Sequence, residues 1–427
     1  MSETRATTTT TTPGLTASIG LGQGVALYVS AILGAGVLVL PGQAASLAGP
    51  AALLAWGFSC LLGVPLAATF AALATRLPDA GGVATYAAEA FGAAAGGVTG
   101  WWYLIAGSVG QTIVPLTGGY YLVAALGLDQ RWAYAFAAAI LLLAVLANLA
   151  GTRISGRVQI GLAVTVGAVL AAASTAGIST MDTTRLTPFA PHGITGVGQA
   201  VLVLFFAFAG WEAIAHLAGE FRNPGQDLPR ATAITIGIVS VLYLAVAAAV
   251  VLTGTYGRTS TDHLAIGTLL HDGLGVGAVD ATAAVAVVIS LGTTNAFVAS
   301  VSRLAYALAR DGWLPQPGAH ISRRNVPDAG IGVVAAIGAA GLALAWAYNW
   351  GTEQIVFIPS ILVVMVYLAG TAAAVKILDG RRRGLAVMAF LLTATVLPFA
   401  WQHLLIPVAV ALAALTVHAT CRTRTRT

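Results

Sequence analysis

Charged residues are scarce in this chain: 8% of its 427 residues are Asp, Glu, Lys or Arg, whereas 58% are hydrophobic. An ordinary soluble protein carries about 25% charged residues and uses them to cover its surface. Without them, large apolar patches would face water. The mean hydropathy of +0.87 fits a chain that folds in lipid. The low charge therefore excludes a soluble multidomain protein.

Cysteines and catalytic motifs are also nearly absent. The two cysteines, Cys60 and Cys421, are too few and too far apart for a disulfide framework or a metal site. The sequence has no Walker-type loop, no H-E-x-x-H and no G-x-S-x-G string. Its basic residues follow or separate apolar stretches, whereas a nucleic-acid-binding domain gathers them on one face. We therefore expect no enzyme, no cofactor, no metal and no nucleic-acid partner.

Long apolar stretches are what the chain does contain. A bilayer core about 30 Å thick needs about 20 apolar residues per helix. Twelve stretches qualify, and the chain is therefore predicted to be an all-α polytopic membrane protein with the lipid bilayer as its solvent. The stretches are residues 17–41, 50–75, 96–126, 132–149, 157–178, 197–218, 231–254, 280–309, 330–348, 353–377, 385–400 and 402–420. The Thr-rich residues 1–16 are expected to form a disordered tail, and residues 421–427 a basic tail.

The basic residues divide unevenly between the two alternating sets of loops. One set, taken together with both tails, holds all the Lys and Arg residues except Arg131, Arg185 and Arg258. This count includes Arg303, which lies in a helix but at the end that faces the same set of loops. Basic residues are retained on the cytoplasmic side of a membrane. The sequence therefore predicts a multi-pass protein of a bacterial inner membrane with both termini in the cytoplasm.

Two of the predicted spans are interrupted at mid-depth. Gly34-Ala35-Gly36 weakens the first span, and Gly210 stands two residues before the acid Glu212 in the sixth. Unwound backbone is tolerated in a membrane only beside a cavity or ligand, although glycines also serve as close-packing faces between helices. Breaks in corresponding spans of two halves are typical of transporters with inverted repeats. Five spans separate the two breaks, and this odd number means that the halves are inverted.

Such breaks suit a zwitterion. The N–H groups at a half-helix N-terminus bind a carboxylate, and freed carbonyl groups bind an ammonium group. Two broken helices can therefore hold the charged part of an amino acid without charged side chains.

At these residues the chain resembles the amino acid–polyamine–organocation (APC) transporter superfamily. The resemblance covers residues 17–380 and rests on four motifs, which are Gly34-Ala35-Gly36 with Val37 to Pro41, Phe206 to Glu212, Glu220 to Arg230, and Arg303 to Pro315. It implies a leucine-transporter-like fold with inverted repeats at 17–180 and 195–380, followed by two appended helices at 384–420. The chain is most similar to the bacterial branch that exports methionine and branched-chain amino acids.

The resemblance also implies a binding site. The carboxylate of the substrate would be bound at Ile32, Gly34, Ala35 and Gly36, and its amino group by carbonyls of Phe206, Ala207 and Ala209. Phe206 matches an aromatic residue that closes over the substrate, and Glu212 matches a glutamate implicated in proton sensing or gating. Trp211 departs from the pattern, since smaller aliphatic residues usually occupy its position.

Polar residues at mid-depth have two interpretations each. Glu212 is either a proton carrier or a buried neutral acid bonded to backbone, because burial favours the neutral carboxyl. His216 and Glu220 share its helical face, as a proton path or as a solvated vestibule. In the eighth span, Asn295 is the preferred candidate for contact with the substrate side chain, although polar side chains in such helices commonly bond backbone. The weaker candidates are Gly107, Ser108, Gln111 and Ser360. His263 and His271 are expected on a solvated turn rather than in a metal site.

The expected function is alternating-access transport of small neutral, apolar L-amino acids, because Ile32, Phe206, Phe208 and Phe297 would give an apolar lining. A channel-like pore and an amino acid/polyamine antiporter are the alternatives. Sodium-independent relatives can carry a lysine in the fifth span, which here has none; Arg157 at its start would act there instead. Coupling to a proton, to sodium or to exchange therefore stays open, as does the oligomeric state.

Overall fold

The computed structural model describes residues 20–77, 82–151, 156–212, 221–275 and 278–424, and the regular elements in these ranges are helices. The long helices are α3 (Ala52–Arg76), α5 (Ala93–Leu126), α6 (Trp132–Leu149), α7 (Gly156–Ala176), α10 (Pro224–Thr253), α13 (Ala278–Arg310), α14 (Asp328–Tyr348), α16 (Phe357–Ile377) and α18 (Leu405–Arg424). The shorter helices are α1 (Leu21–Ile32), α2 (Leu40–Ala48), α4 (Val83–Phe91), α8 (Gly193–Leu204), α11 (Thr259–His263), α12 (Ala265–Leu274), α15 (Thr352–Ile355) and α17 (Gly380–Ala394). Short 3₁₀ segments lie at Ala35–Leu38 (η1), Gly49–Ala51 (η2), Gly177–Thr180 (η3), Thr183–Leu186 (η4), Gln316–Ala319 (η6) and Leu397–His403 (η7).

The apolar helices agree with the predicted membrane spans. Within the described ranges, nine helical segments are long and apolar enough to cross a membrane, and a tenth is α17 with η7, bent by 50°. The first and sixth predicted spans contain the shorter apolar helices α1 and α8, and these are the two spans predicted to be broken. The all-α polytopic fold is confirmed, and the count of twelve spans stays a prediction.

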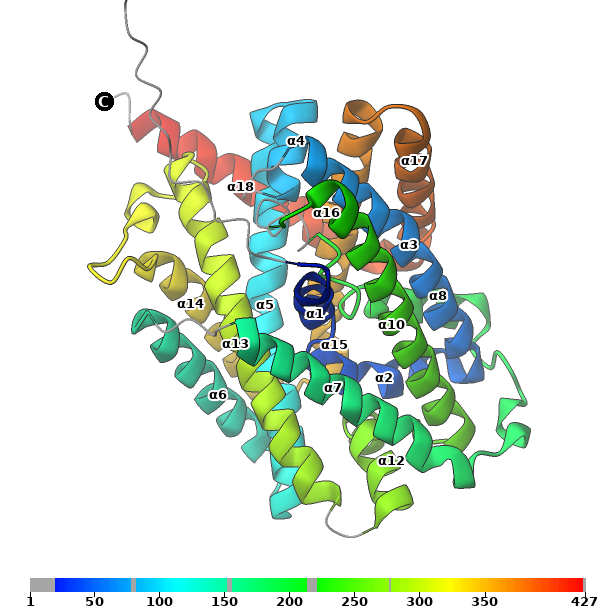
Figure 1. Ribbon diagram of the computed structural model, residues 1–427. Helices are drawn as coiled ribbons and strands as arrows, with labels where there is room; N and C mark the ends of the chain where they lie inside the picture. The colour runs from blue at the N-terminus through cyan, green and yellow to red at the C-terminus, as the bar shows by residue number, and fades with distance from the viewer. Residues whose placement is uncertain (1–19, 78–81, 152–155, 213–220, 276–277, 425–427) are drawn as a thin grey trace, which may run out of the picture.

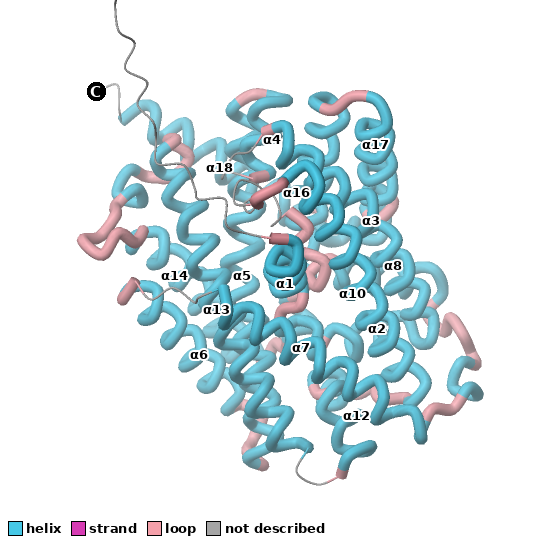
Figure 2. Tube along the Cα trace, in the orientation of Figure 1, coloured by secondary structure: helices cyan, strands magenta, loops and turns pink. Residues whose placement is uncertain are grey.

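The helices pack around the first half of the first span. Figure 1 shows α1 almost end-on in the middle of the bundle, with α5, α13, α10 and α3 around it. Figure 2 shows loop segments next to α1 at the same depth, where the backbone leaves the helical path. In the apolar stretches of α5 and α16, 72% of the residues are buried inside the protein, against 11% in α18. The bundle is therefore centred on α1, whereas α18 offers its sides to lipid.

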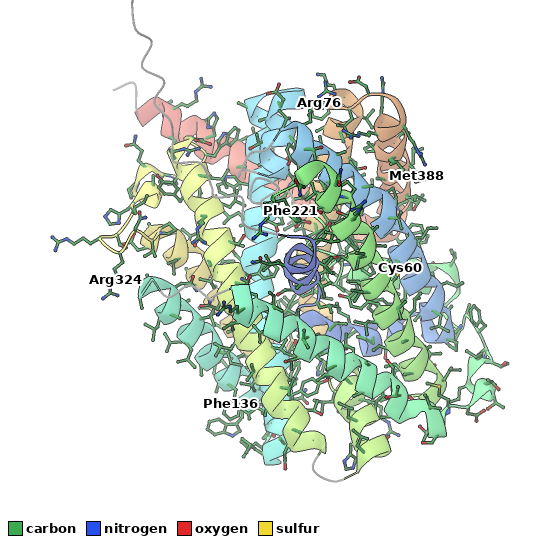
Figure 3. The ribbon with its side chains drawn as sticks, viewed as in Figure 1. Cys60, Arg76, Phe136, Phe221, Arg324 and Met388 are labelled. Atoms are coloured by element: carbon green, nitrogen blue, oxygen red, sulfur yellow. The ribbon has the colours of Figure 1, made fainter. Side chains whose placement is uncertain are left out.

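Several contacts join helix ends and loops that were predicted to lie on the same side of the membrane. Arg76 at the end of α3 forms an ion pair with Asp379 before α17, with 2.8 Å between Nη1 and Oδ2. Lys376 Nζ donates to the carbonyl of Ala90 over 2.6 Å. Figure 3 shows Arg76 at the end of its helix. Nη1 of Arg324 donates to the carbonyl of Leu149 at the end of α6 over 3.3 Å. Loops from the set that holds most of the Lys and Arg residues thus meet at one face of the bundle.

One expectation for the connection between α10 and α13 is wrong. This segment was expected to be a solvated turn, yet it folds into α11 and α12, and His263 at the end of α11 is only 2% exposed. The imidazole ring of His263 stacks on the ring of Tyr120 from α5, with 4.0 Å between the ring centres. His271 on α12 is exposed, as expected. The two histidines belong to separate short helices, so their spacing along the sequence does not give their surroundings.

Candidate functional site

The first span is broken where its glycines lie. Helix α1 ends at Ile32, Gly34 adopts an extended conformation with φ −87° and ψ 178°, and η1 begins at Ala35. Within the described part of the chain, the N–H groups of Ala35 and Gly36 have no hydrogen-bond partner. Both residues line a cavity, so these two donors are available to an anion there.

The sixth span is broken in the corresponding place. Helix α8 ends at Leu204, and residues 205–212 form turns instead of α-helix. Gly210 has φ +133°, a conformation that residues with a side chain rarely adopt. A Cβ atom on Gly210 would lie 2.8 Å from the carbonyl oxygen of Ala31. Glycine is therefore required here both for the backbone conformation and for the close approach of the two breaks.

A tyrosine that sequence reasoning missed lies between the two breaks. The hydroxyl oxygen of Tyr243, from α10, is 3.2 Å from the carbonyl of Ile32 and 3.1 Å from that of Ala207. The side chain is buried, and its one hydroxyl proton can serve either carbonyl. Tyr243 thus links the end of α1 to the turns after α8. Tyr243 is the one aromatic residue in the sequence of α10, but the sequence does not show that its hydroxyl reaches the two breaks.

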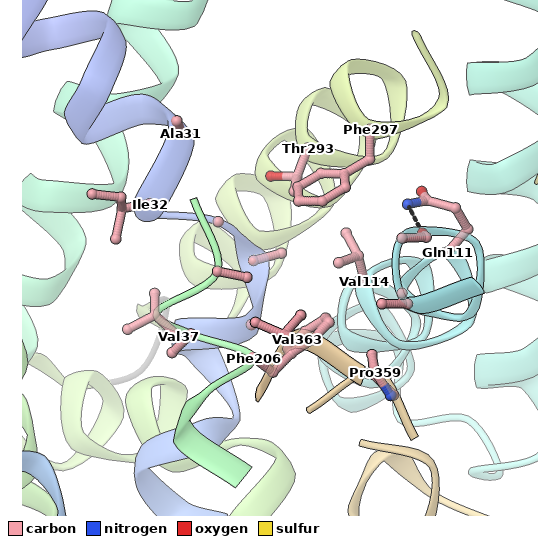
Figure 4. A pocket seen from close by; sticks show the side chains of 18 of the residues that line it. Ala31, Ile32, Val37, Gln111, Val114, Phe206, Thr293, Phe297, Pro359 and Val363 are labelled. Carbon is pink, nitrogen blue, oxygen red and sulfur yellow. Dashed lines mark hydrogen bonds between the residues drawn. The ribbon is translucent and has the colours of Figure 1, made fainter. Parts of the chain in front are cut away.

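The two breaks line one cavity with α5, α13 and α16. The cavity has a volume of about 40 Å³, more than the ~10–15 Å³ that a single water needs. Figure 4 shows Ile32 and Val37 on one side of the cavity and Gln111 on the other. The lining residues are Ala31, Ile32, Gly34, Ala35, Gly36, Val37, Tyr103, Ala106, Gly107, Gly110, Gln111, Val114, Phe206, Ala207, Ala209, Thr293, Phe297, Pro359 and Val363.

Seven of the eight candidate substrate-binding residues line this cavity, and Asn295 does not. The side-chain oxygen of Asn295 instead accepts a hydrogen bond from Asn148 on α6, with 2.8 Å to Nδ2. On α13 the cavity is lined by Thr293 and Phe297, which are four residues apart and therefore share a helical face. Asn295 lies two residues from each, on the side that faces α6. The sequence showed that α13 is polar, but not which of its faces meets the cavity.

Two of the weaker candidates, Gly107 and Gln111, also line the cavity. The Gln111 side chain donates from Nε2 to the carbonyl of Gly107 over 2.9 Å, and its Oε1 atom has no partner among the described residues. Ser108 and Ser360 are buried outside the lining. The walls are thus mainly apolar, with the polar groups of Gln111 and Thr293 at a few points.

Phe206 packs across the middle of the site. Its ring would lie 3.1 Å from a Cβ atom placed on Gly36, and 3.5 Å from one placed on Gly110 of α5. The ring therefore covers the η1 end of the cavity, next to the free N–H groups of Ala35 and Gly36. The two glycines leave room for this large aromatic side chain.

Glu212 is bound by two tyrosine hydroxyls from different helices. Tyr103 of α5 donates to Oε1 over 2.8 Å, and Tyr367 of α16 donates to Oε2 over 2.6 Å. The N–H of Gly210 lies 3.1 Å from Oε2. Glu212 is 2% exposed, so these donors provide the hydrogen bonds that a buried carboxyl group requires. Because Tyr103 also lines the cavity, it connects Glu212 to that space.

Trp211, the residue that departs from the superfamily pattern, is enclosed beside Glu212. Its ring meets the ring of Tyr28 edge-on, with 5.7 Å between the ring centres, and its carbonyl accepts from the Tyr28 hydroxyl over 2.9 Å. Gly63 on α3 allows this position, since a Cβ atom there would lie 3.0 Å from the indole ring. The large side chain thus packs between α1 and α3. His216 and Glu220 lie outside the described residues.

The arrangement of two broken helices around an apolar cavity invites comparison with known proteins. The sequence profile of the family described as Amino acid permease matches residues 19–419. This chain belongs to that family. The match confirms the resemblance to the APC superfamily.

Two relatives match the permease over nearly its whole length, and a third over 71% of it. The chain is 31% identical to the uncharacterized amino acid permease YecA of Bacillus subtilis, over 94% of this chain and 95% of YecA. It is 30% identical to the L-methionine/branched-chain amino acid exporter YjeH of Escherichia coli, over 92% of this chain and 94% of YjeH. The serine/threonine exchanger SteT of Bacillus subtilis is 29% identical, over 71% of this chain and 70% of SteT. The permease is therefore a multi-pass membrane protein that transports amino acids and is not an enzyme, and it lies close to the exporter branch.

Proposed function

We propose that this permease carries small neutral, apolar L-amino acids across the bacterial inner membrane by alternating access. The observation that carries the proposal is the meeting of the two helix breaks at one cavity with few polar groups. The free N–H groups of Ala35 and Gly36 would bind the substrate carboxylate, with Ile32 and Gly34 beside them. Carbonyls of Phe206, Ala207 and Ala209 would bind the amino group. Backbone alone would then meet both charges of the zwitterion.

The substrate side chain would project towards α5, α13 and α16. Phe297, Val114 and Val363 line this part of the cavity, and no Asp, Glu, Lys or Arg is among the lining residues that the structure describes. A cationic side chain would lie there without a counter-charge, which is costly at membrane depth. The relation to YjeH, an exporter of methionine and branched-chain amino acids, supports the same substrate class and outward transport. In place of Asn295, we assign contact with the substrate side chain to Thr293 and Gln111.

The transport cycle would follow from two inverted repeats, 17–180 and 195–380, which rock about the site, with residues 384–420 as appended helices. The tails 1–16 and 421–427 would lie in the cytoplasm. Glu212 would carry the coupling proton, because the hydroxyl of Tyr103 joins its carboxyl group to the cavity. Phe206 would close over the bound substrate. Exchange of one amino acid for another is the second candidate mode, favoured by the relation to SteT.

Counterflow in proteoliposomes tests the proposal. Vesicles loaded with unlabelled methionine should accumulate labelled methionine and leucine, while arginine and putrescine should neither accumulate nor compete. The panel is measured with and without sodium, at two pH values and with empty vesicles, to separate proton coupling, sodium coupling and exchange. Accumulation of arginine would overturn the substrate class. A conductance that does not saturate with substrate would overturn the carrier mechanism in favour of a channel.

A further inference from the structure

A buried ion pair lies apart from the substrate cavity. Nε2 of His263 on α11 is 2.6 Å from Oε2 of Glu353 on α15. Tyr120 of α5 covers the imidazole in a parallel stack, and Gln130 after α5 lies 3.4 Å from its Nδ1. The imidazole side chain is 2% exposed, whereas that of Glu353 is 33% exposed. The imidazole is therefore buried in the protein, whereas the carboxyl group of Glu353 reaches solvent and gives protons a route to the pair.

The same region holds α11 against α2, the helix that follows the first break. The Ser46 hydroxyl of α2 donates to Asp262 of α11 over 2.6 Å. A Cβ atom on Gly42 would lie 2.6 Å from the carbonyl oxygen of Asp262, so the two backbones touch. On its other side, α2 is bound to α15 through Gln43, whose Nε2 donates to the hydroxyl of Thr352 over 2.6 Å. Helix α2 is thus fixed between α11 and α15, the two elements that the ion pair joins.

This packing closes the cavity on the side of α2. Leu38, Val39 and Leu40 connect the cavity-lining η1 segment to α2, and each is at most 1% exposed. The hydroxyl of Tyr121 on α5 donates to the carbonyl of Leu38 over 3.1 Å. On the proposed orientation this is the outer side of the membrane. Opening the cavity outward would require α11 and α15 to separate from α2, and that movement would break the ion pair.

We propose that His263 and Glu353 form a proton-binding site that holds the outer side of the permease closed. The proposal rests on the proposed function and on the proposed orientation of the termini. When His263 is protonated, the positive charge of the imidazolium adds a coulombic attraction to its hydrogen bond with the Glu353 carboxylate. When His263 is neutral, the attraction weakens and α11 separates more easily. A histidine side chain can change its charge within the physiological pH range, so a change in external pH would act on this contact.

The groups around the pair leave Glu353 as the partner of the imidazole. The titratable groups that face it from the packed elements, within the described residues, are Asp262 on α11, Tyr120 on α5 and Tyr134 on α6. Burial raises the pKa of the Asp262 carboxyl, and bonds from Ser46 and from the N–H of Gly257 act against this shift. Asp262 is therefore satisfied locally. Its hydrogen bonds go to Ser46 and to the N–H of Gly257 and hold α11 on α2, whereas the imidazole of His263 is bonded to Glu353.

Labelling of a cysteine in the cavity measures how often the outer side opens. Val37, which lines the cavity and is 1% exposed, is replaced by cysteine in a Cys60→Ala, Cys421→Ala background. Cells are treated from outside with a membrane-impermeant thiol reagent at pH 5.5 and 8. Because the thiol itself reacts faster at high pH, the rate is divided by that of Ser179→Cys, an exposed position in η3 on the same face. We expect this ratio to rise about tenfold from pH 5.5 to 8, the factor for roughly 1.4 kcal/mol.

The variants separate the ion pair from other pH effects. His263→Gln removes the imidazole and Glu353→Gln removes the carboxylate charge, while each keeps a hydrogen-bonding side chain at its position. Each variant should make the ratio independent of pH. His271→Gln, on the exposed histidine of α12, is the matched control and should keep the rise. A ratio that does not change with pH in the parent, or that still rises in His263→Gln, would overturn the proposal. If Val37→Cys does not fold, Val114→Cys, at another buried position of the cavity lining, is labelled in the same way and gives the same comparison.

The two proposals fail in distinguishable ways. Labelling does not depend on which amino acid is carried, so counterflow of arginine would overturn the substrate class and leave the pH-sensitive contact intact. Labelling of Val37→Cys only from the cytoplasmic side of inverted vesicles, at either pH, would overturn the orientation on which the contact depends.

Discussion

Gly210→Ala tests whether the close approach of the two helix breaks builds the substrate site. At φ +133°, a residue with a Cβ atom is strained by about 1–3 kcal/mol. The new methyl group would also lie 2.8 Å from the carbonyl of Ala31, which cannot move without disturbing the end of α1. If the backbone relaxes instead, the N–H of Gly210 loses its contact with Glu212. Whichever part of the backbone moves to accommodate the methyl group, the two helix breaks are separated or strained.

The strain should appear mainly as weaker substrate binding. The long helices of the bundle are unaffected, so the variant should still insert, whereas the empty site can relax into a conformation that substrate binding must reverse. About 1–3 kcal/mol corresponds to a roughly 5- to 150-fold rise in the dissociation constant. The assay is binding of labelled methionine to purified protein, together with its unfolding temperature in detergent.

Gly237→Ala is the control, since Gly237 lies inside α10 at an exposed position and a Cβ atom there would meet nothing within 4 Å. Alanine is favoured over glycine in a helix by about 1 kcal/mol, so this variant should bind normally and be as stable or slightly more so. Wild-type binding by Gly210→Ala would refute the reasoning. Equal losses in both variants would point to a general effect of the added methyl groups.

Three further substitutions test other parts of the site. Glu212→Gln should retain binding and lose the pH dependence of counterflow, because the amide cannot carry a proton; an unchanged pH profile would exclude Glu212 as the proton site. Gly36→Leu should abolish methionine binding but insert normally, because its side chain enters the space of the Phe206 ring, which is 3.1 Å from a Cβ atom at this position; normal transport would refute the proposed carboxylate site. Tyr243→Phe should lower the unfolding temperature and weaken binding several-fold, because a buried carbonyl without its donor costs about 1–3 kcal/mol; unchanged values for both would show that the bridge between the breaks is dispensable.

The membrane helices and the two breaks could be predicted because their causes are local. A run of about 20 apolar residues forms a helix in lipid whatever surrounds it. Gly34 and Gly36 weaken one helix, and Gly210 with Glu212 weakens another, within a few residues of sequence. The seven candidate residues that line the cavity all lie in these two short segments. The proposed carboxylate and amino-group sites therefore follow from local rules.

The partners of these segments could not be predicted. Tyr103 and Tyr367 bind Glu212 from 109 and 155 residues away, and Tyr243 reaches both breaks from α10. Asn295 was preferred on the eighth span, but Thr293 and Phe297 line the cavity instead. Which residues do so depends on the rotation of α13, and its polar composition does not give that rotation. His263 looked like a solvated loop residue because α11 has five residues, which is too short to show the periodic pattern of apolar residues that indicates a packed helix.

The sequence by itself determined that the chain is a membrane protein, where its helices lie, which two of them break and which loops carry the positive charge. These properties depend on hydropathy, glycine content and charge along the chain. The tertiary structure alone decided which face of each helix meets the cavity, that two tyrosines hold the buried acid, and that a histidine in a connecting loop is enclosed against a glutamate. These properties depend on side chains that are distant in sequence, and only the packing of the helices brings them within hydrogen-bonding distance.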